Sequence, residues 1–406
     1  MWSLAATSYL VAVFNRMSLG VAALGTMSRF NLSPGVLGLF SSLQLLVYLL
    51  MQVPSGVLAD KWGPRRTLCL GVVLMGIGQV GFGLGHTPPI GLASRAVVGL
   101  GDALIFLNVL RLAQNWFPVG RYAFLAALTG LIGGAGQLFS TSPLRASLTR
   151  FGWVATFVTA GLLTTGLGLA LWAFVRDRPH DAMAHPQPGL ALSPSAEHPS
   201  RSRAHERQRT RFGLWAHFSL MGPFLTFTAL WGYPYLVKAQ GRSGSAAGAL
   251  LALAVVAFAV AAPSAGWVAS RNGLRDPILL VTSVAVVVVW ALVMGWPGGQ
   301  LPGPLLLVLL IVTGIGGAVS LLAFDVAREA NPPERGGRAT AFVNLGGFGF
   351  AVVAAFLVGA VLDLQHAAGS DTPQAFRLAF VLVLAMAGIG LIQVVRLRPR
   401  PTPSDR

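Results

Sequence analysis

The stretch Gly56-Val57-Leu58-Ala59-Asp60-Lys61-Trp62-Gly63-Pro64-Arg65-Arg66 is a dense group of charges between two long apolar segments. Charged side chains at this density are unstable in the hydrocarbon core of a bilayer, so we expect a tight turn between two membrane-spanning helices. Because basic residues collect in cytoplasmic loops, the turn is expected on the cytoplasmic side. The stretch therefore predicts a helical membrane protein.

The composition of the whole chain indicates the same class. Its 406 residues are 54% hydrophobic and only 10% charged, a balance that is not typical of soluble globular proteins. A helix needs ~20 apolar residues to cross a bilayer. Segments of this kind predict an all-α polytopic membrane protein with twelve transmembrane helices, at residues 4–28, 37–59, 69–86, 90–114, 121–143, 152–175, 213–237, 245–269, 277–296, 303–327, 338–363 and 376–395.

The net charge of +16 follows the predicted topology. With twelve spans and a cytoplasmic N-terminus, 21 of the 29 Lys and Arg residues fall on the cytoplasmic side, which fits a membrane protein better than a nucleic-acid surface. Both termini are therefore expected in the cytoplasm, and the membrane is expected to be a bacterial cytoplasmic (inner) membrane. The first apolar segment lacks a basic n-region and a cleavage site, so we expect it to remain as a span.

Residues 176–211 form the one strong change in composition, being rich in Pro, Ser, His and Arg. They predict a flexible cytoplasmic linker between an N-terminal six-helix bundle, residues 1–175, and a C-terminal six-helix bundle, residues 212–395. A cytoplasmic tail follows at 396–406. Two bundles that rock about a central site are the arrangement expected of a transporter.

The two halves of the chain also carry weak internal similarity. Residues 266–275 echo the opening stretch, with Ser270 where Asp60 would stand. Residues 111–121 correspond to 328–338 in the same way. A repeated unit is harder to obtain by accident than one motif, so this similarity favours a duplicated fold.

The residue order from Gly56 to Arg66 resembles a family signature. It is similar to the Gly-x-Leu-x-Asp-Arg-x-Gly-Arg-Arg loop between the second and third helices of major facilitator superfamily transporters, with Lys61 in place of the first arginine and Pro64 inserted before the arginine pair. The resemblance covers nearly the whole chain and implies the fold of that family.

Arg16 and Asp102 are the charged residues expected near the middle of the membrane, in the first and fourth spans. A guanidinium at mid-bilayer costs at least ~2.5–3.5 kcal/mol on insertion scales, so Arg16 needs a function or a partner. It can hold a substrate carboxylate or phosphate by a two-pronged contact, or be bound permanently by another protein group. Asp102 can carry a proton by losing and regaining an arginine partner, or form a fixed ion pair with Arg16 or Arg95.

Arg95, Gly99 and Asp102 fall on one face of the fourth span because they are four and three residues apart. The string from Arg95 to Asp102 resembles the Arg-x-x-x-Gly signature of the superfamily, and the acid after Gly-x-Gly is similar to that of organic-anion/proton symporters. In those relatives an arginine near the middle of helix 1 helps to bind the anion, a role that the resemblance transfers to Arg16. The preceding residue is often an acid there and is Asn15 here.

The charged loop suggests a gate as well as a turn. Asp60 can cap an adjacent helix and pair with an arginine, and the resemblance implies helix 11 and Arg111 as its partners. Such contacts would close the cytoplasmic side in the outward-open state, whereas the alternative is a turn that only sets topology. The candidate gating residues are Gly56, Asp60, Gly63, Arg65, Arg66 and Arg111.

Other polar or aromatic residues within spans are weaker candidates for substrate contact. Trp231 and Tyr235 can line a cavity or belong to the aromatic belt at the membrane interface. The amides can contact a ligand or only join helices by hydrogen bonds. The candidate substrate-binding residues are Arg16, Asn15, Gln44, Gln137, Trp231, Tyr235 and Asn344, and those for proton coupling are Asp102 and Arg95.

The sequence thus favours a secondary transporter that moves a small organic anion by proton symport. A drug/proton antiporter is the first alternative, disfavoured because the fifth span lacks a Gly-Pro step, and a membrane sensor or enzyme is a second. There is no Walker loop, no metal-ligand spacing and no Gly-x-Ser-x-Gly turn, so no cofactor or metal is expected. The expected partners are a small molecule, a proton and lipid, and the expected state is a monomer.

Overall fold

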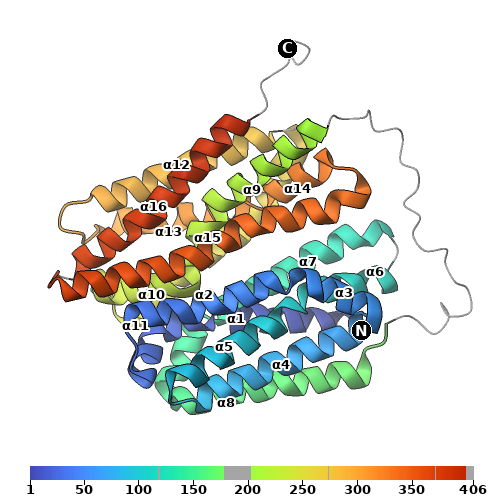
Figure 1. Ribbon diagram of the computed structural model, residues 1–406, viewed down its shortest axis with the longest axis horizontal. Coiled ribbons are helices and arrows are strands. Elements are labelled where there is room, and N and C mark those ends of the chain that lie inside the picture. Colours follow the sequence, from blue (N-terminus) through green and yellow to red (C-terminus); the bar gives the residue numbers. More distant parts are fainter. Residues whose placement is uncertain (118, 178–202, 273, 371, 399–406) are drawn as a thin grey trace, which may run out of the picture. The chain divides into compact units, whose positions relative to one another are not determined.

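The computed structural model describes residues 1–117, 119–177, 203–272, 274–370 and 372–398, and it contains helices and turns but no strand in this part of the chain (Figure 1). The predicted all-α membrane fold is confirmed. The helices are α1 (Trp2–Phe30), α2 (Pro34–Leu50), α3 (Gln52–Trp62), α4 (Pro64–Leu84), α5 (Pro88–Ala103), α6 (Phe106–Trp116), α7 (Val119–Phe139), α8 (Ser142–Phe174), α9 (Arg203–Thr226), α10 (Gly232–Pro234), α11 (Gly244–Asn272), α12 (Arg275–Gly295), α13 (Gly303–Val319), α14 (Leu322–Ala330), α15 (Pro333–Ala367) and α16 (Thr372–Leu397).

Within the described ranges, nine helical stretches are individually long and apolar enough to span a membrane, and α2 with α3 forms a tenth that is bent by 47°. One of the nine, Phe124–Phe174, has 51 residues. At ~1.5 Å per residue it is more than twice as long as the ~30 Å hydrocarbon core, so it accommodates two of the predicted spans. The chain changes direction there at Gly152, whose φ of 79° is not helical.

The charged turn from Gly56 to Arg66 is confirmed and is very short. Helix α3 ends at Trp62 and α4 begins at Pro64, so Gly63 alone joins them. Its φ of 84° lies in a region that glycine adopts without the steric cost of a side chain. Pro64 occupies the first helical position, where its missing N–H breaks no helical hydrogen bond.

Two predicted spans are interrupted at corresponding places. The fourth span, expected to be continuous over 90–114, breaks at Leu104 and Ile105 between α5 and α6, and the tenth, expected over 303–327, breaks between α13 and α14. At the first break the amide of Leu104 donates to Gly101 O over 3.1 Å and that of Ile105 donates to Asp102 O over 3.1 Å. These contacts tighten the helix into a turn with a shorter repeat.

The seventh span contains two π-helical turns, Phe227–Trp231 and Tyr235–Ala239, on either side of α10. Gly232 and Pro234, residue types that permit a local break in a membrane helix, lie in α10 between the two turns. The helix preceding these turns, α9, starts at Arg203, inside the segment predicted as linker. Most of that linker, 178–202, lies outside the described residues, as does most of the tail at 399–406.

The helices form two compact units. The described residues of unit 1 come from Met1–Leu190, Thr226–Val255 and Val352–Ala379, and those of unit 2 from Ala191–Leu225, Val256–Ala351 and Phe380–Arg406. Parts of the C-terminal half therefore pack with the N-terminal helices, and the division into bundles at 1–175 and 212–395 stays a prediction. Inside unit 1, α4 packs against α5 and α8, α1 against α7, and α2 against α5.

Candidate functional site

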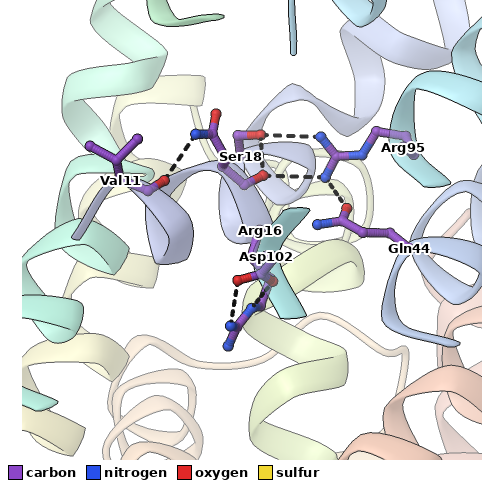
Figure 2. Close-up of polar contacts among 7 residues, drawn as sticks. Val11, Arg16, Ser18, Gln44, Arg95 and Asp102 are labelled. Carbon is purple, nitrogen blue, oxygen red and sulfur yellow. Dashed lines mark hydrogen bonds and ion pairs between the residues drawn. The ribbon is translucent and has the colours of Figure 1, made fainter. Parts of the chain in front are cut away.

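The centre of unit 1 holds a buried ion pair between α1 and α5. Arg16 Nε donates to Asp102 Oδ2 over 2.6 Å, and Arg16 Nη2 donates to Asp102 Oδ1 over 2.8 Å (Figure 2). Only 7% of Arg16 and 1% of Asp102 are exposed. Two parallel N–H donors on one carboxylate make the strongest kind of protein ion pair, and they fix the orientation of both side chains.

Arg16 also has an aromatic neighbour that closes one side of its guanidinium. The ring of Tyr48, from α2, lies 4.6 Å from the Arg16 Cζ atom. A cation over an aromatic face is attracted to the ring, and the attraction is stronger where water is excluded. A carboxylate and an aromatic ring therefore both contact Arg16, and these are the two kinds of group that best accommodate a desolvated guanidinium.

Arg95 lies on α5, as Asp102 does, but its guanidinium contacts groups outside the Arg16–Asp102 pair. Its Nη2 donates to Gln44 Oε1. The same Nη2 also donates to Asn15 O over 3.4 Å, and Nη1 donates to Ser18 Oγ over 3.5 Å (Figure 2). No carboxylate of a described residue forms an ion pair with it. A fully buried guanidinium is thus held by neutral oxygens and by the ring of Phe82, 5.1 Å away.

Gly99 explains why Gln44 can reach Arg95. The two helices α2 and α5 approach so closely that a Cβ atom on Gly99 would collide with the backbone carbonyl of Gln44. Small residues permit this backbone approach between membrane helices. The approach brings Gln44 next to Arg95, one turn away from Gly99 on the same helix.

We expect Gly99→Val to destabilise the protein by about 1–3 kcal/mol, the usual cost of forcing extra methyl groups into a packed interior. The measurement is the midpoint of thermal unfolding in detergent. Gly166→Val is the matched control, because Gly166 is also helical but has nothing within 4 Å of the added Cβ. Equal midpoints for the two variants would contradict the packing role of Gly99.

Asn15 lies beside the ion pair but directs its side chain elsewhere. Its Nδ2 donates to Val11 O over 2.9 Å and to Thr164 Oγ1 of α8 over 3.3 Å. Its Oδ1 is buried and has no hydrogen-bond partner among the described residues. Arg95 therefore joins Gln44 to the backbone of Asn15, while Arg16 pairs with Asp102 and the Asn15 side chain binds other groups.

Three other candidates for substrate contact also belong to unit 1. Gln137 Nε2 of α7 donates to Thr228 Oγ1 over 3.3 Å, and Trp231 Nε1 donates to Ala355 O over 3.0 Å. Tyr235 packs against Phe376, with 5.8 Å between ring centroids. Trp231 is 1% exposed and Tyr235 is 2% exposed, so the interpretation of these rings as an aromatic belt at the membrane interface is wrong. Asn344 belongs to unit 2, where it is half-buried in α15.

The candidate gating residues lie on α3, α4 and α6 and, for Gly63, between α3 and α4. Arg111 Nη1 of α6 donates to Asp60 Oδ1 over 2.6 Å, as the family resemblance implied. Gly56 faces Arg111, with 4.0 Å between an added Cβ and Nη2. The Arg65 backbone amide donates to Asp177 Oδ1 over 2.8 Å and its side chain donates to Trp172 O, while Arg66 is exposed.

We expect Asp60→Asn to slow transport several-fold while changing the free energy of unfolding by at most about 1 kcal/mol. The reason is that ion pairs between exposed groups contribute little to stability, and the Asp60 side chain is 69% exposed. Asp363→Asn is the control, since Asp363 lies outside the charged loop and its carboxylate accepts hydrogen bonds from Ser33 Oγ over 2.8 Å and from Gly35 N over 2.9 Å. Equal transport by the two variants would contradict a gating role for Asp60.

Sequence reasoning missed several residues of the site. Tyr48 and Ser18 contact the two buried arginines, and Thr228 contacts Gln137, but none of them belongs to a charged or repeated motif. Asp177 was assigned to the linker, and it binds the first turn of α4. Within the described residues no group of three His, Cys, Asp or Glu side chains could hold a metal ion.

A family model described as Major Facilitator Superfamily matches residues 5–298 and 224–406, which together cover nearly all of the chain. The chain belongs to the major facilitator superfamily. A solved structure of this fold, a bacterial homologue of the human lysosomal transporter Spinster in an inward-facing and occupied conformation, aligns with 99% of this chain and 98% of its own, with a TM-score of 0.75 and 16% identity. At that identity the likeness shows the fold alone.

Curated relatives of this superfamily transporter match over part of its sequence. A probable sulfoacetate transporter of Cupriavidus necator is 27% identical over 171 residues, 42% of this chain and 40% of the relative. A probable L-galactonate transporter of Escherichia coli is 28% identical, covering 42% and 39%. A quinolone resistance transporter of Acinetobacter baumannii is 29% identical, covering 42% and 40%. The matches thus span about two-fifths of the curated relatives.

Proposed function

We propose that this superfamily transporter moves a small organic anion across the membrane by alternating access, in symport with a proton. The observation that supports the proposal is the buried two-pronged contact between Arg16 and Asp102. The carboxylate in this position supports an oxyanion as the ligand of the guanidinium. An organic carboxylate, sulfonate or phosphate presents the same oxygens in the same geometry.

The pair also provides a way to couple anion and proton binding. As long as Asp102 is ionised, it occupies two donors of Arg16 that an anion would need. Protonation removes the negative charge of Asp102 and weakens its hold on the guanidinium. A proton on Asp102 therefore favours an anion on Arg16, and by reciprocity the anion favours the proton. Both would cross the membrane together.

The charge of the surrounding groups supports an anionic cargo. Two buried guanidinium groups, those of Arg16 and Arg95, lie near a single buried carboxylate, that of Asp102. An isolated buried charge is costly unless another charge compensates it. An anion bound at Arg16 would supply the compensating charge when Asp102 is protonated, whereas a cation would add to the excess.

The names of the relatives favour the same class of cargo. Sulfoacetate and L-galactonate, named in two of them, are organic anions that contain a carboxylate. The quinolone resistance relative is the observation in favour of drug/proton antiport. We favour the anion because the buried charges of unit 1 include one carboxylate against two arginines. The match to a transporter superfamily leads us to propose a transporter in preference to a membrane enzyme.

The test uses purified protein in liposomes with an imposed pH gradient, acidic on the side of addition. Labelled sulfoacetate, L-galactonate, a dicarboxylate, a peptide and a cationic quinolone are supplied in turn, and empty liposomes serve as the control. We expect uptake of at least one anion that rises with the gradient. Movement of the quinolone against the proton, with no anion transported, would replace the proposal by drug antiport.

A further inference from the structure

Unit 2 contains a second cluster of arginines, far along the sequence from Arg16. It lines a cavity of about 630 Å³ between the first turns of α9 and the start of α15. In the predicted topology, these parts of α9 and α15 lie on the cytoplasmic side of the membrane. The lining residues are Arg203, Glu206, Arg207, Thr210, Arg211, Asn331, Arg335, Arg338, Ala339 and Phe342.

The cavity is framed by two cross-links between its walls. Asn331 Nδ2, just before α15, donates to Thr210 Oγ1 of α9 over 2.8 Å. Arg335 Nη1 of α15 lies 3.3 Å from Glu206 Oε2 of α9. Two contacts thus tie α9 to α15 and to the residue before it at the wall of the space. We call this space with its lining residues the arginine pocket.

The charges of the arginine pocket are not balanced. Among the described residues that line it, Glu206 is the single carboxylate, and Arg335 forms an ion pair with it. The four other arginines, on two helices, form no ion pair with any described residue: Arg203, Arg207, Arg211 and Arg338. On α9 they recur every fourth residue and so share one face of the helix. Several guanidinium groups that converge on one space form a site for phosphate oxygens.

The apolar side of the pocket indicates what kind of molecule carries the phosphate. Phe342 lines the pocket and is 43% exposed, and Leu345, 43% exposed, follows it on the same face of α15. Arg338 precedes both on that face. A strip that passes from arginines to exposed apolar side chains matches a phospholipid, with its headgroup on the arginines and its acyl chains along Phe342 and Leu345.

We propose that the arginine pocket binds a phosphate-bearing anion, and that its ligand is the headgroup of an anionic phospholipid such as phosphatidylglycerol. Basic pockets at the cytoplasmic ends of membrane helices bind such headgroups in other proteins. The lipid would bridge α9 and α15 and thereby stabilise the start of the seventh span. This site is separate from the buried ion pair of unit 1 and does not depend on the transported substrate.

The test measures binding of dioleoyl phosphatidylglycerol to the full-length protein in detergent by native mass spectrometry, with dioleoyl phosphatidylcholine as the neutral lipid. Each arginine near an anionic headgroup contributes about 1 kcal/mol, so R207Q/R211Q is expected to weaken phosphatidylglycerol binding by roughly 30-fold and R338Q by about fivefold. The matched control is R396Q/R398Q, which removes the same charge from exposed arginines at the end of α16. Thermal unfolding checks that each variant is folded.

The source of the phosphate is distinguished by titration with inorganic phosphate. Binding of phosphatidylglycerol that millimolar phosphate does not displace supports the lipid headgroup. A second outcome is that the wild type binds inorganic phosphate, that R207Q/R211Q does not, and that no lipid binds selectively. In that case the arginine pocket is a phosphate site, but its ligand is a free anion and not a lipid. An equal effect of R207Q/R211Q and R396Q/R398Q, or no binding of either probe to the wild type, overturns the proposal.

Discussion

Asp102→Asn is expected to abolish proton-driven accumulation of the anion while leaving exchange of labelled for unlabelled anion intact. The asparagine side chain has almost the same shape as aspartate, so the packing between α1 and α5 is preserved. It carries no titratable proton, and it holds Arg16 less firmly than a carboxylate does. Anion can still bind and cross, but its movement is no longer linked to the pH gradient.

The size of this effect follows from the energy of the gradient. One pH unit corresponds to 1.36 kcal/mol, so coupling to one proton supports about tenfold accumulation and loss of coupling reduces the ratio to about one. Uptake and exchange are measured in the same liposome preparation. Asp363→Asn is the matched control, because the Asp363 carboxylate accepts hydrogen bonds from Ser33 Oγ and Gly35 N, over 2.8 and 2.9 Å, away from the buried pair. Full accumulation by Asp102→Asn would rule out Asp102 as the proton carrier.

Arg16→Ala is expected to reduce anion transport by more than 100-fold and to destabilise the protein as well. Two charge-assisted hydrogen bonds to the anion are lost, each worth about 1.5–3 kcal/mol. The substitution also leaves the Asp102 carboxylate buried without its partner, and breaking a buried pair in this way costs about 3–5 kcal/mol. Arg16→Lys keeps the charge but cannot make the two-pronged contact, so an intermediate loss of transport is expected.

A second substitution separates the two effects of Arg16→Ala. In Arg16→Ala/Asp102→Asn the unpaired carboxylate is removed, so the midpoint of thermal unfolding is expected to recover while transport stays absent. Arg29→Ala serves as the control for removal of an arginine from α1, because Arg29 donates to Gly83 O and Gly85 O and has no carboxylate partner among the described residues. Anion transport by Arg16→Ala at the wild-type rate would contradict the binding role of Arg16.

Much of the fold follows from local sequence. The spans are long apolar segments, and the turn after the second span is fixed by Gly63 and Pro64, whose backbone preferences act within one residue of each other. The breaks within the fourth and tenth spans were not predicted. They fall at Leu104–Ile105 and at Ser320–Leu321, where neither a proline nor a glycine marks the break. The early start of α9 at Arg203 was missed because its charged first turns have the composition of a linker.

The residues of the site could be predicted from the sequence, but which of them pair with each other could not. Charged side chains in a span must find partners, which brings Arg16, Arg95 and Asp102 to attention from sequence alone. Either arginine could have taken Asp102. The choice depends on the close approach of α2 and α5 at Gly99, which supplies Gln44 to Arg95 and leaves Asp102 to Arg16. Such tertiary contacts have no local signature in the chain.

The most direct test of proton-coupled anion transport is to measure both fluxes in one experiment. Liposomes contain wild-type protein and a pH-sensitive dye, the membrane potential is clamped, and the anion found by the uptake screen is added outside with no pH gradient. We predict that the lumen acidifies in step with anion entry, and that Asp102→Asn admits anion without acidification. Anion entry into wild-type liposomes with no change in lumenal pH would contradict the coupling of Arg16 and Asp102.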